Sequence, residues 1–226
     1  MKKVNKFSKA LMQVKKIIGR GNVLLDDVAL ALNSFDGSPV RARPDAVLNI
    51  ASAAKLAKVI KALATNKIPF TPRMAASNHD GGCIALRGGC VLNLTKLNKI
   101  ISINTEEGFA IVESGVVNQD LQNALALLGY FYAPDPGSMQ FSTIGGNAAL
   151  NAGGAKTLKY GSTASNLLKV EIITPEGEIM LLDRAANGPD LAALLTRSEG
   201  TLCLITKLWV KILPSPKKFK TILAYF

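Results

Sequence analysis

The chain has 226 residues, of which 48% are hydrophobic and 19% are charged, and its formal net charge is +11. This length accommodates one or two compact domains with a buried core, and the hydrophobic content excludes a disordered chain. No apolar run reaches the ~20 residues that a membrane-spanning helix needs. Nucleic-acid binding would explain the charge, but the basic residues are dispersed and few aromatic residues lie among them. An anionic cofactor, an anionic substrate or an acidic redox partner explains it equally well.

Residues 1–35 are predicted to form an N-terminal helical extension. Apolar residues recur there at helical spacing, with lysines on the opposite face: Val4, Phe7, Leu11, Val14 and Ile18. We expect this helix to pack on the domain, and binding to an anionic membrane surface is the alternative. The segment has no continuous apolar core of the kind found in a secretory signal. Asp26 and Asp27 are expected to cap a second, short helix that ends at Leu32.

The main body begins at Pro44 with a predicted strand–helix–strand unit. Residues 47–50 form a short apolar run typical of a buried strand, and Ser52 can cap the helix that follows. The next strand covers 68–71. Pro69 cannot donate a hydrogen bond to a neighbouring strand, so we expect it at the start of this strand or on an edge strand. The connection from the helix back to the second strand is short, which predicts a small parallel sheet.

The middle of the chain predicts two more strands and a helix. Residues 91–94 follow a Gly-Gly turn and read as a strand, and a short connection leads to a strand at 109–112. A helix is expected to begin at 117 or 118 and to end before Gly129, because glycine commonly terminates helices.

Residues 134–161, PDPGSMQFSTIGGNAALNAGGAKTLKYG, are rich in glycine and in small polar residues. Only residues 148–150 are predicted to be helical there. Glycine costs chain entropy, so this density indicates tight turns or a backbone that approaches a bulky ligand closely. Backbone N–H groups near a helix start bind anions, phosphate above all. A long surface loop is the alternative, but loops of this length in compact domains are usually functional.

The last part of the chain predicts a hairpin, a helix and a strand. Strands are expected at 167–174 and 178–182, joined by a Pro-Glu-Gly turn. A short helix at 190–195 and a strand with alternating character at 204–213 follow. The three cysteines are an odd number without metal-ligand spacing: Cys83, Cys90 and Cys203. They predict no metal site and free thiols in a reducing cytoplasm.

The run PDP–S–TIGGN–NAGG–KYG resembles the second flavin-binding segment of the FAD-linked oxidases of the vanillyl-alcohol oxidase/PCMH type. Within that family it is most similar to the glycolate oxidase FAD subunit and the D-lactate and D-2-hydroxyacid dehydrogenases. The segments RPDAVLN, PRMAASNHDGGCIAL and RSEGTLCLIT resemble further motifs of the family. The resemblance covers about residues 40–215. It implies an α+β fold, a PCMH-type FAD-binding domain in which FAD lies between two α+β subdomains.

The resemblance also implies how the chain is divided. The FAD-binding domain is expected at 36–215, with subdomain one at about 40–100 and subdomain two at about 101–215. Residues 216–226 are expected to begin a cap domain, because family members continue into a substrate-binding cap.

The expected site residues are carried over from the family by motif match. The pyrophosphate of FAD is expected to meet Arg73, Met74, Ala75, Ala76, Ser77, Asn78 and Gly81. The flavin and its linker are expected to meet Pro134, Asp135, Ser138, Thr143, Gly145, Gly146 and Asn147. The wall of the second subdomain is expected to contain Gly153, Gly154, Tyr160 and Gly161. The adenosine or the flavin is expected to lie near Glu199, Gly200 and Ile205. No catalytic residue is assigned, because the family's candidates lie in the cap.

The sequence departs from the family's pattern at several of these positions. Met74, Ala76 and Asn78 stand where glycine is common in the first loop, and Arg197 and Cys203 stand where glycine is usual in the closing motif. Asparagine tolerates left-handed backbone better than most residues, whereas alanine tolerates close approach better than positive φ.

His79 is the only histidine of the chain. Near a flavin it could act as a base, as a covalent flavin anchor or as a hydrogen-bonding loop residue. Some members of the wider family attach flavin through a histidine in this loop, but the spacing from Arg73 matches that position to Ser77. We therefore expect FAD to be bound non-covalently.

The resemblance implies that a 2-hydroxy acid of the glycolate or D-lactate type is oxidised to a 2-oxo acid. The expected partners are that substrate, a cap-domain polypeptide and an iron–sulfur or other electron-transfer subunit, with no nucleic acid. The expected location is the cytoplasm, with peripheral attachment at the inner membrane face as an alternative. The isolated chain is expected to be inactive without the cap. A non-catalytic FAD-binding module or split-enzyme subunit, and a basic nucleic-acid or membrane-surface protein with a decayed flavin fold, remain the alternatives.

Overall fold

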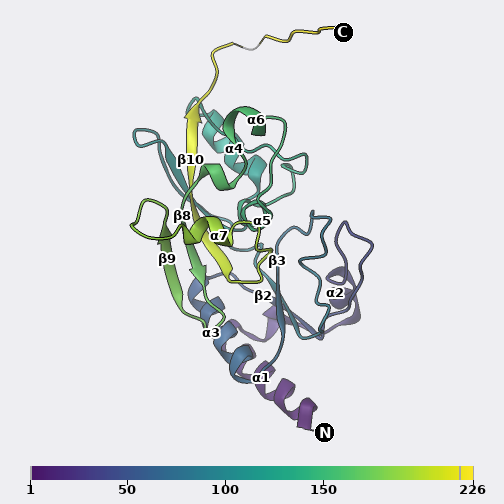
Figure 1. Ribbon diagram of the computed structural model, residues 1–226. Helices are drawn as coiled ribbons and strands as arrows, with labels where there is room; N and C mark the ends of the chain where they lie inside the picture. The colour runs from purple at the N-terminus through teal and green to yellow at the C-terminus, as the bar shows by residue number, and fades with distance from the viewer. Residues whose placement is uncertain (1, 219, 226) are drawn as a thin grey trace.

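The computed structural model describes residues 2–218 and 220–225, with side chains described from residue 6 onward. The elements form two sheets, one in each half of the chain, and Figure 1 shows the first sheet and its helices below the second. Residues 1, 219 and 226, which fall in the predicted N- and C-terminal segments, lie outside the described residues. No described helix is both long and apolar enough to cross a membrane.

The first half builds a four-stranded sheet. Its elements are α1 (Lys2–Ile18), η1 (Arg20–Asn22), β1 (Val23–Leu24), α2 (Asp27–Leu32), β2 (Ala46–Asn49), α3 (Ala53–Thr65), β3 (Phe70–Arg73) and β4 (Cys90–Asn93). The strand order is β1-β2-β4-β3, and β4 pairs in parallel with both β2 and β3. The predicted parallel sheet is therefore confirmed. The strand predicted at 68–71 lies at 70–73 as β3, which is an edge strand and contains Pro72. An edge strand tolerates proline because its missing N–H can face away from the ladder.

Helices α1 and α3 cover the first sheet with their apolar faces. Leu11 and Val14 of α1 pack with Leu56 and Ile60 of α3 in one buried cluster that also contains Leu48 of β2. The Ser52 hydroxyl accepts a hydrogen bond from the Lys55 amide and thus caps α3, as its sequence predicts. The amphipathic pattern of α1 therefore reflects packing on the domain.

The second half builds a six-stranded sheet. Its elements are β5 (Ile100–Asn104), β6 (Phe109–Glu113), α4 (Asn118–Ala126), β7 (Tyr130–Tyr132), α5 (Ile144–Leu150), α6 (Thr157–Tyr160), η2 (Ala164–Asn166), β8 (Leu167–Ile173), β9 (Ile179–Asp183), α7 (Leu191–Leu195) and β10 (Leu204–Pro214). The antiparallel order is β5-β6-β10-β8-β9, and β7 pairs with the far end of β10. The predicted hairpin of β8 and β9 is confirmed.

Several predictions for this half are wrong. The connection after β4 contains β5, and strand β7 was not predicted. The helix of the glycine-rich segment begins at Ile144 rather than at residue 148, and the same segment contains a second helix, α6. Helix α5 accommodates Gly145 and Gly146 because Thr143 caps it and because Gly145 packs closely on Ser114. Tertiary contact here overrides the low helix propensity of glycine.

The two halves meet at the ends of the strands of the second sheet. Ile173 of β8 and Leu204 of β10 belong to the buried cluster of the first sheet rather than to that of the second. This packing joins the two cores. It also brings the loop that follows β3 opposite α5 and the start of β10, and the candidate site lies there.

Candidate cofactor site

A cavity of about 370 Å³ lies between the two halves, within the ~300–1,000 Å³ range of ligand sites. One wall is the loop that follows β3, and the other is formed by α5 and by the residues that precede and open β10. The expected site residues that line it are Met74, Ala75, Ala76, Ser77, Asn78, Ser138, Thr143, Gly145, Gly146, Asn147, Glu199, Gly200 and Ile205. Three motifs that are far apart in the sequence therefore share one cavity.

The loop after β3 presents unpaired backbone donors. In the described part of the chain, the amide N–H groups of residues 75–78 donate to no protein acceptor. All four residues line the cavity, and Ala76 has a φ of 55°, in the left-handed region. Successive N–H groups in such a turn form a concave site for an anion. The alanine that replaces a common glycine thus keeps the glycine-like conformation, at the cost of some strain.

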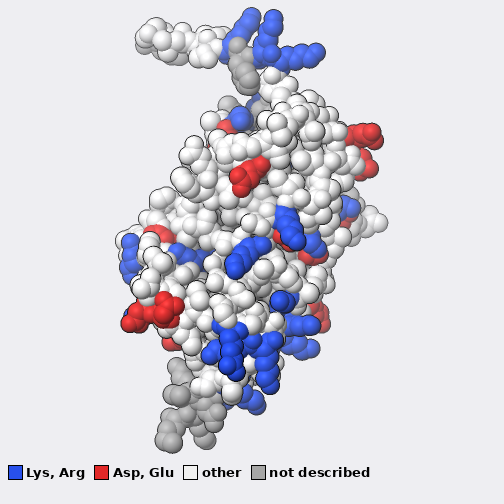
Figure 2. Space-filling model, turned by 180° about the vertical axis from the view of Figure 1, so that it is seen from behind, with Lys and Arg blue, Asp and Glu red and all other residues white. Residues whose placement is uncertain are grey.

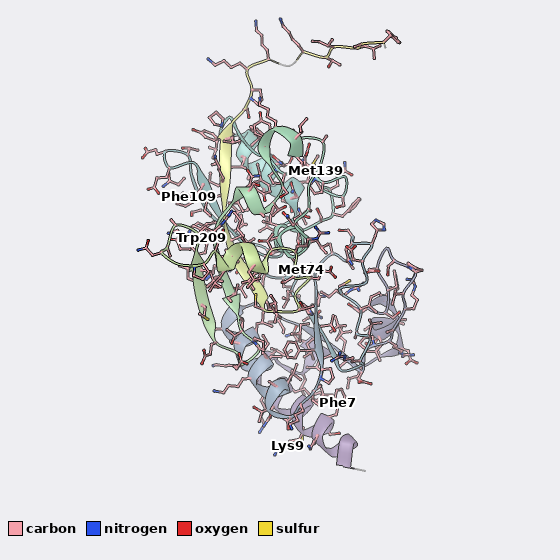
Figure 3. The ribbon with its side chains drawn as sticks, viewed as in Figure 1. Phe7, Lys9, Met74, Phe109, Met139 and Trp209 are labelled. Carbon is pink, nitrogen blue, oxygen red and sulfur yellow. The ribbon has the colours of Figure 1, made fainter. Side chains whose placement is uncertain are left out.

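Helix α5 supplies the opposite wall, and its two glycines have different roles. A Cβ on Gly145 would lie 2.7 Å from the Ser114 carbonyl oxygen, so this glycine is required for packing between α5 and the β6 end. A Cβ on Gly146 would meet only the Thr143 hydroxyl at 3.1 Å and Met74 at 4.0 Å. The contact with the Thr143 hydroxyl is tight but involves one side-chain atom, so the Cβ position of Gly146, which lines the cavity, is much less crowded than that of Gly145. Figure 3 labels Met74 where the two halves of the molecule meet.

Two buried polar side chains of this wall have no protein partner. The Ser142 hydroxyl and the Asn147 amide nitrogen are buried without a hydrogen bond in the described residues, and both residues line the cavity. Buried polar groups are nearly always satisfied, but these two atoms are enclosed by protein rather than exposed to the cavity, so they do not by themselves indicate a cavity ligand.

A short strained turn closes the cavity next to β10. Arg197, Glu199 and Gly200 all have positive φ, at 73°, 55° and 74°. The Glu199 amide donates to the Ala149 carbonyl at 3.0 Å, which ties the turn to the end of α5. A Cβ on Gly200 would lie 2.7 Å from Pro72, so the turn also packs on β3.

Arg73 does not line the cavity, although its motif position predicts contact with the pyrophosphate. Its buried guanidinium donates to the Phe35 carbonyl at 2.7 Å, to the Leu32 carbonyl at 3.3 Å and to the Cys83 sulfur at 3.4 Å. These bonds hold the segment that follows α2 against the back of the loop. Arg73 therefore positions the loop from behind.

The remaining expected residues also lie outside the cavity lining: Gly81, Pro134, Asp135, Gly153, Gly154, Tyr160 and Gly161. They support the glycine-rich segment. A Cβ on Gly154 would overlap the Asp135 carbonyl, and the Asp135 carboxylate accepts the Lys156 amide at 3.1 Å. The ring of Tyr160 meets Phe131 edge to face with centroids 5.5 Å apart.

Motif matching missed several lining residues: Pro72, His79, Asp80, Gly82, Cys83, Leu94, Ser142, Ala149, Leu150, Ala152, Ser198, Cys203 and Leu204. Ser142 lies one residue before Thr143, the residue that caps α5. Its position next to the motif is the one sequence signal that it lines the cavity. His79 contacts the Gly37 carbonyl at 3.2 Å through Nδ1, a bond typical of an ordinary loop residue.

The cysteines are free and buried, as predicted for reduced thiols. Burial raises the pKa of Cys203 to about 11, and burial also raises the pKa of Cys83 to about 11, despite the opposing effect of Arg73. Both thiols are therefore protonated at neutral pH. Among the described residues, no group of three or more His, Cys, Asp or Glu side chains could hold a metal ion.

The sequence profile of a family described as FAD binding domain matches residues 44–183, more than half of the chain. This chain belongs to the FAD-binding domain family. Its fold is the PCMH type, and the cofactor of the family is FAD. The predicted family, α+β fold class and cofactor are confirmed.

Curated relatives of this FAD-binding domain include a D-lactate dehydrogenase of Anaerostipes hadrus, 36% identical over 219 residues, with 94% of this chain and 46% of the relative covered. The glycolate oxidase subunit GlcD of Bacillus subtilis is 34% identical over 219 residues, with 95% and 47% covered. The chain thus spans about half the length of the curated relatives it matches. Among solved structures, p-cresol methylhydroxylase superposes with a TM-score of 0.83 at 22% identity, covering 95% of this chain and 44% of that one. This last similarity concerns the fold alone.

The residues that line the cavity fit FAD, which carries a diphosphate anion between two flat ring systems. The unpaired amides of residues 75–78 suit the diphosphate, and the absence of a side chain at Gly146 allows a ring to approach the backbone.

Proposed function

We propose that this chain is the FAD-binding portion of an oxidoreductase that converts a 2-hydroxy acid of the glycolate or D-lactate type into a 2-oxo acid. The observation that carries the proposal is the row of unpaired amides at residues 75–78, in a loop that lines the same cavity as Gly146. The names of the relatives, D-lactate dehydrogenase and glycolate oxidase subunit, support the substrate class.

Each wall of the cavity has a separate task in this proposal. The loop amides bind the diphosphate, while Gly146 lets the flavin lie against the backbone of α5. Bound FAD accepts a hydride from the substrate, and the protein contributes binding, orientation and electrostatics. The buried network behind the loop, which includes Arg73, keeps the donors in place. Glu199 and the strained turn close the end of the cavity next to β10.

The substrate's carboxylate requires a cation that this cavity does not contain. Neither lysine nor arginine is among the described residues that line it. Lys156 pairs with Asp135 at 3.6 Å, and Arg73 is held by backbone carbonyls. We therefore propose that a cap-domain polypeptide completes the substrate site. The same observation favours the second candidate, a non-catalytic FAD-binding module or a subunit of a split enzyme.

The partner that receives the electrons is proposed to be an electron-transfer subunit with an acidic surface. Figure 2 shows Lys and Arg side chains gathered toward the lower end of the molecule, where Figure 1 places α1 and α3. Exposed lysines of these two helices include Lys9, Lys16, Lys55, Lys58 and Lys61. Such a positive region steers an acidic partner at a rate that falls with ionic strength.

The test is a titration of the apoprotein with FAD, followed by flavin absorbance and fluorescence. FAD should bind, whereas riboflavin, which lacks the diphosphate, should bind much more weakly. Ala76→Asp places a carboxylate in the anion site, in a conformation that aspartate tolerates, and should lower FAD affinity at least tenfold, about 1.4 kcal/mol. Ala54→Asp, at an exposed position of α3, is the control. A protein that stays colourless in excess FAD, or an unchanged affinity of Ala76→Asp, would contradict the proposal.

A further inference from the structure

Strand β9 forms an unprotected edge of the second sheet. In the described residues it pairs with β8 alone, and Figure 1 shows it at the outer side of the molecule. Ile179, Met180 and Leu181 are 48%, 44% and 55% exposed, and residues 179–182 contain neither charge nor proline. Proteins usually blunt such an edge with charges, proline or a bulge. The opposite edge strand, β5, has a register irregularity, whereas β9 pairs regularly with β8.

The hydrogen bonds of the hairpin show which backbone groups of β9 face outward. The Thr174 amide donates to the Glu178 carbonyl at 2.9 Å, and the Arg184 amide donates to the Leu168 carbonyl at 3.1 Å. Bonded residues alternate along an antiparallel pair, so the even-numbered residues of β9 bond to β8. The N–H and C=O groups of Ile179 and Leu181 and the N–H of Asp183 therefore point toward the free edge, while the Asp183 carbonyl already accepts the Ala186 amide at 3.1 Å.

We propose that β9 is a dimerisation edge, at which two copies of this chain pair antiparallel about a two-fold axis through Leu181. This register places Leu181 opposite Leu181 of the second copy and pairs Ile179 with Asp183, so that all outward-facing residues find partners. It joins the two sheets into one and buries the exposed apolar side chains. A two-fold axis closes the assembly, which removes the free edge from both copies. This inference goes beyond cofactor binding and does not depend on it.

Charge complementarity selects this register over its neighbours. Pairing about Leu181 sets Glu178 opposite Arg184 of the second copy, twice per dimer. Centring on Leu182 would instead set Glu178 opposite Ala186, with no ion pair. Centring on Met180 would set Glu178 opposite Leu182, and would bring Arg184 level only with Glu176, which lies in the hairpin turn outside β9. Arg184 bonds Asp190 through Nε and two carbonyls through Nη1, and its Nη2 has no acceptor in the described residues. An exposed pair of this kind adds little affinity but fixes register.

No free like charges meet in the proposed dimer. Asp183 is the one acidic residue within β9, and its carboxylate is already paired with Lys169 at 2.7 Å. Helix α7 packs on β8 and β9, and its Leu191 and Leu194 are 43% and 63% exposed. They add apolar surface beside the same edge, which a second copy would cover.

Sedimentation velocity over a range of protein concentrations tests the proposal. Wild type should dimerise reversibly. Leu181→Lys sets two lysines opposite each other at the axis and should give a monomer, whereas Leu127→Lys, at a still more exposed leucine just after α4, should not. Leu181→Pro removes an outward N–H but no bond to β8, and should also give a monomer. A wild type that is monomeric at all concentrations, or a dimer unaffected by Leu181→Lys, overturns the proposal.

A disulfide tests the register. Directly opposite residues have Cα atoms ~5.5 Å apart in a bonded antiparallel pair, within the range that a disulfide spans. Leu181→Cys should therefore give a covalent dimer on oxidation, visible on a non-reducing gel, and the buried native cysteines should not interfere. Met180→Cys and Leu127→Cys are the controls and should remain largely uncrosslinked. Equal crosslinking of Met180→Cys and Leu181→Cys overturns the Leu181 axis.

Discussion

Asn78 donates its side-chain amide to the buried carboxylate of Asp36 at 2.6 Å, across 42 residues of sequence. Asp36 also accepts the Ser38 amide at 2.8 Å, and the Cys83 thiol contacts both Asp36 and Asn78. The Asn78 side chain thus faces away from the proposed diphosphate and anchors the loop whose amides form the anion site. The geometry of that site therefore depends on a residue outside every cofactor motif.

The first prediction concerns Asp36→Asn, which removes the carboxylate that organises this network. Hydrogen bonds to a buried charge contribute about 1.5–3 kcal/mol, so we expect a loss of about 1–3 kcal/mol in the free energy of unfolding. FAD affinity should fall as well, because the loop becomes less ordered. Urea unfolding and FAD titration measure the two effects. An unchanged FAD affinity would show that the network does not position the loop.

The pH dependence of this effect has a defined sign. Burial of Asp36 raises its pKa, but hydrogen bonds from Ser38, Asn78 and Cys83 outweigh burial, and the pKa lies below the usual value of 3.8. A lowered pKa contributes stability that is complete above pH 3.8 and is lost as the pH falls through the folded value. The stability difference between wild type and Asp36→Asn should therefore shrink below pH 3.8. A difference that grows on acidification contradicts this assignment.

The second prediction separates the two glycines of α5. Gly146→Val should abolish FAD binding while the apoprotein stays folded, since a branched side chain fills the open space against the cavity. Gly145→Ala should instead lower the melting temperature, because its Cβ meets the Ser114 backbone. Circular dichroism melting and FAD titration of both variants distinguish these roles. Normal FAD affinity in a folded Gly146→Val protein would remove α5 from the site.

The third prediction is that FAD is held without a covalent bond. His79 bonds the Gly37 carbonyl, and burial raises the pKa of Cys83 to about 11, which leaves its thiol protonated and poorly nucleophilic. Acid precipitation of the FAD-loaded protein should release all flavin into the supernatant. His79→Ala should retain FAD. Flavin that stays with the precipitated wild type and is lost in His79→Ala would show a covalent link.

The fourth prediction concerns the strained turn. Arg197 is exposed and has a φ of 73°, where the resembled family motif has glycine. Arg197→Gly relieves ~1–2 kcal/mol of left-handed strain and costs ~0.5–1 kcal/mol of chain entropy, for a net gain of about 0.5–1 kcal/mol. The melting temperature should rise by about 1–4 °C. Arg87→Gly, at an exposed position without positive φ, is the control and should show no rise.

The fifth prediction is that the isolated chain does not oxidise glycolate, D-lactate or D-2-hydroxyglutarate at a useful rate. Correct placement of the substrate supplies a large share of the rate, and the described cavity lining contains no lysine or arginine for the carboxylate. Dye reduction by the FAD-loaded chain should be neither saturable nor selective for one enantiomer. A cap-domain polypeptide supplied in trans should restore activity. Saturable, enantioselective turnover by the chain alone would contradict the prediction.

Local sequence determined much of the secondary structure. Asp26 and Ser52 cap the helices that follow them, and the Pro-Glu-Gly turn joins β8 to β9, as predicted. Asp190, predicted as the first residue of a short helix, caps α7. Each of these signals is a side chain or a turn that acts on the backbone a few residues away, so the local sequence is enough to predict it. Strand β5 was missed because it is an edge strand with exposed residues, so it lacks the apolar run of a buried strand.

The glycine motifs determined which loops line the cavity, because a loop that approaches a ligand needs small residues wherever it lies in the fold. Only the tertiary structure decided what each residue does. Gly145 packs on Ser114 while its neighbour Gly146 faces the cavity, and Arg73 turns away to hold residues 32–35. Asp36 supports the loop that lines the cavity, although it belongs to none of the family's motifs. These roles depend on contacts between segments that are far apart in the chain. Spacing in the sequence does not tell which face of a loop packs on the rest of the fold and which faces the cavity.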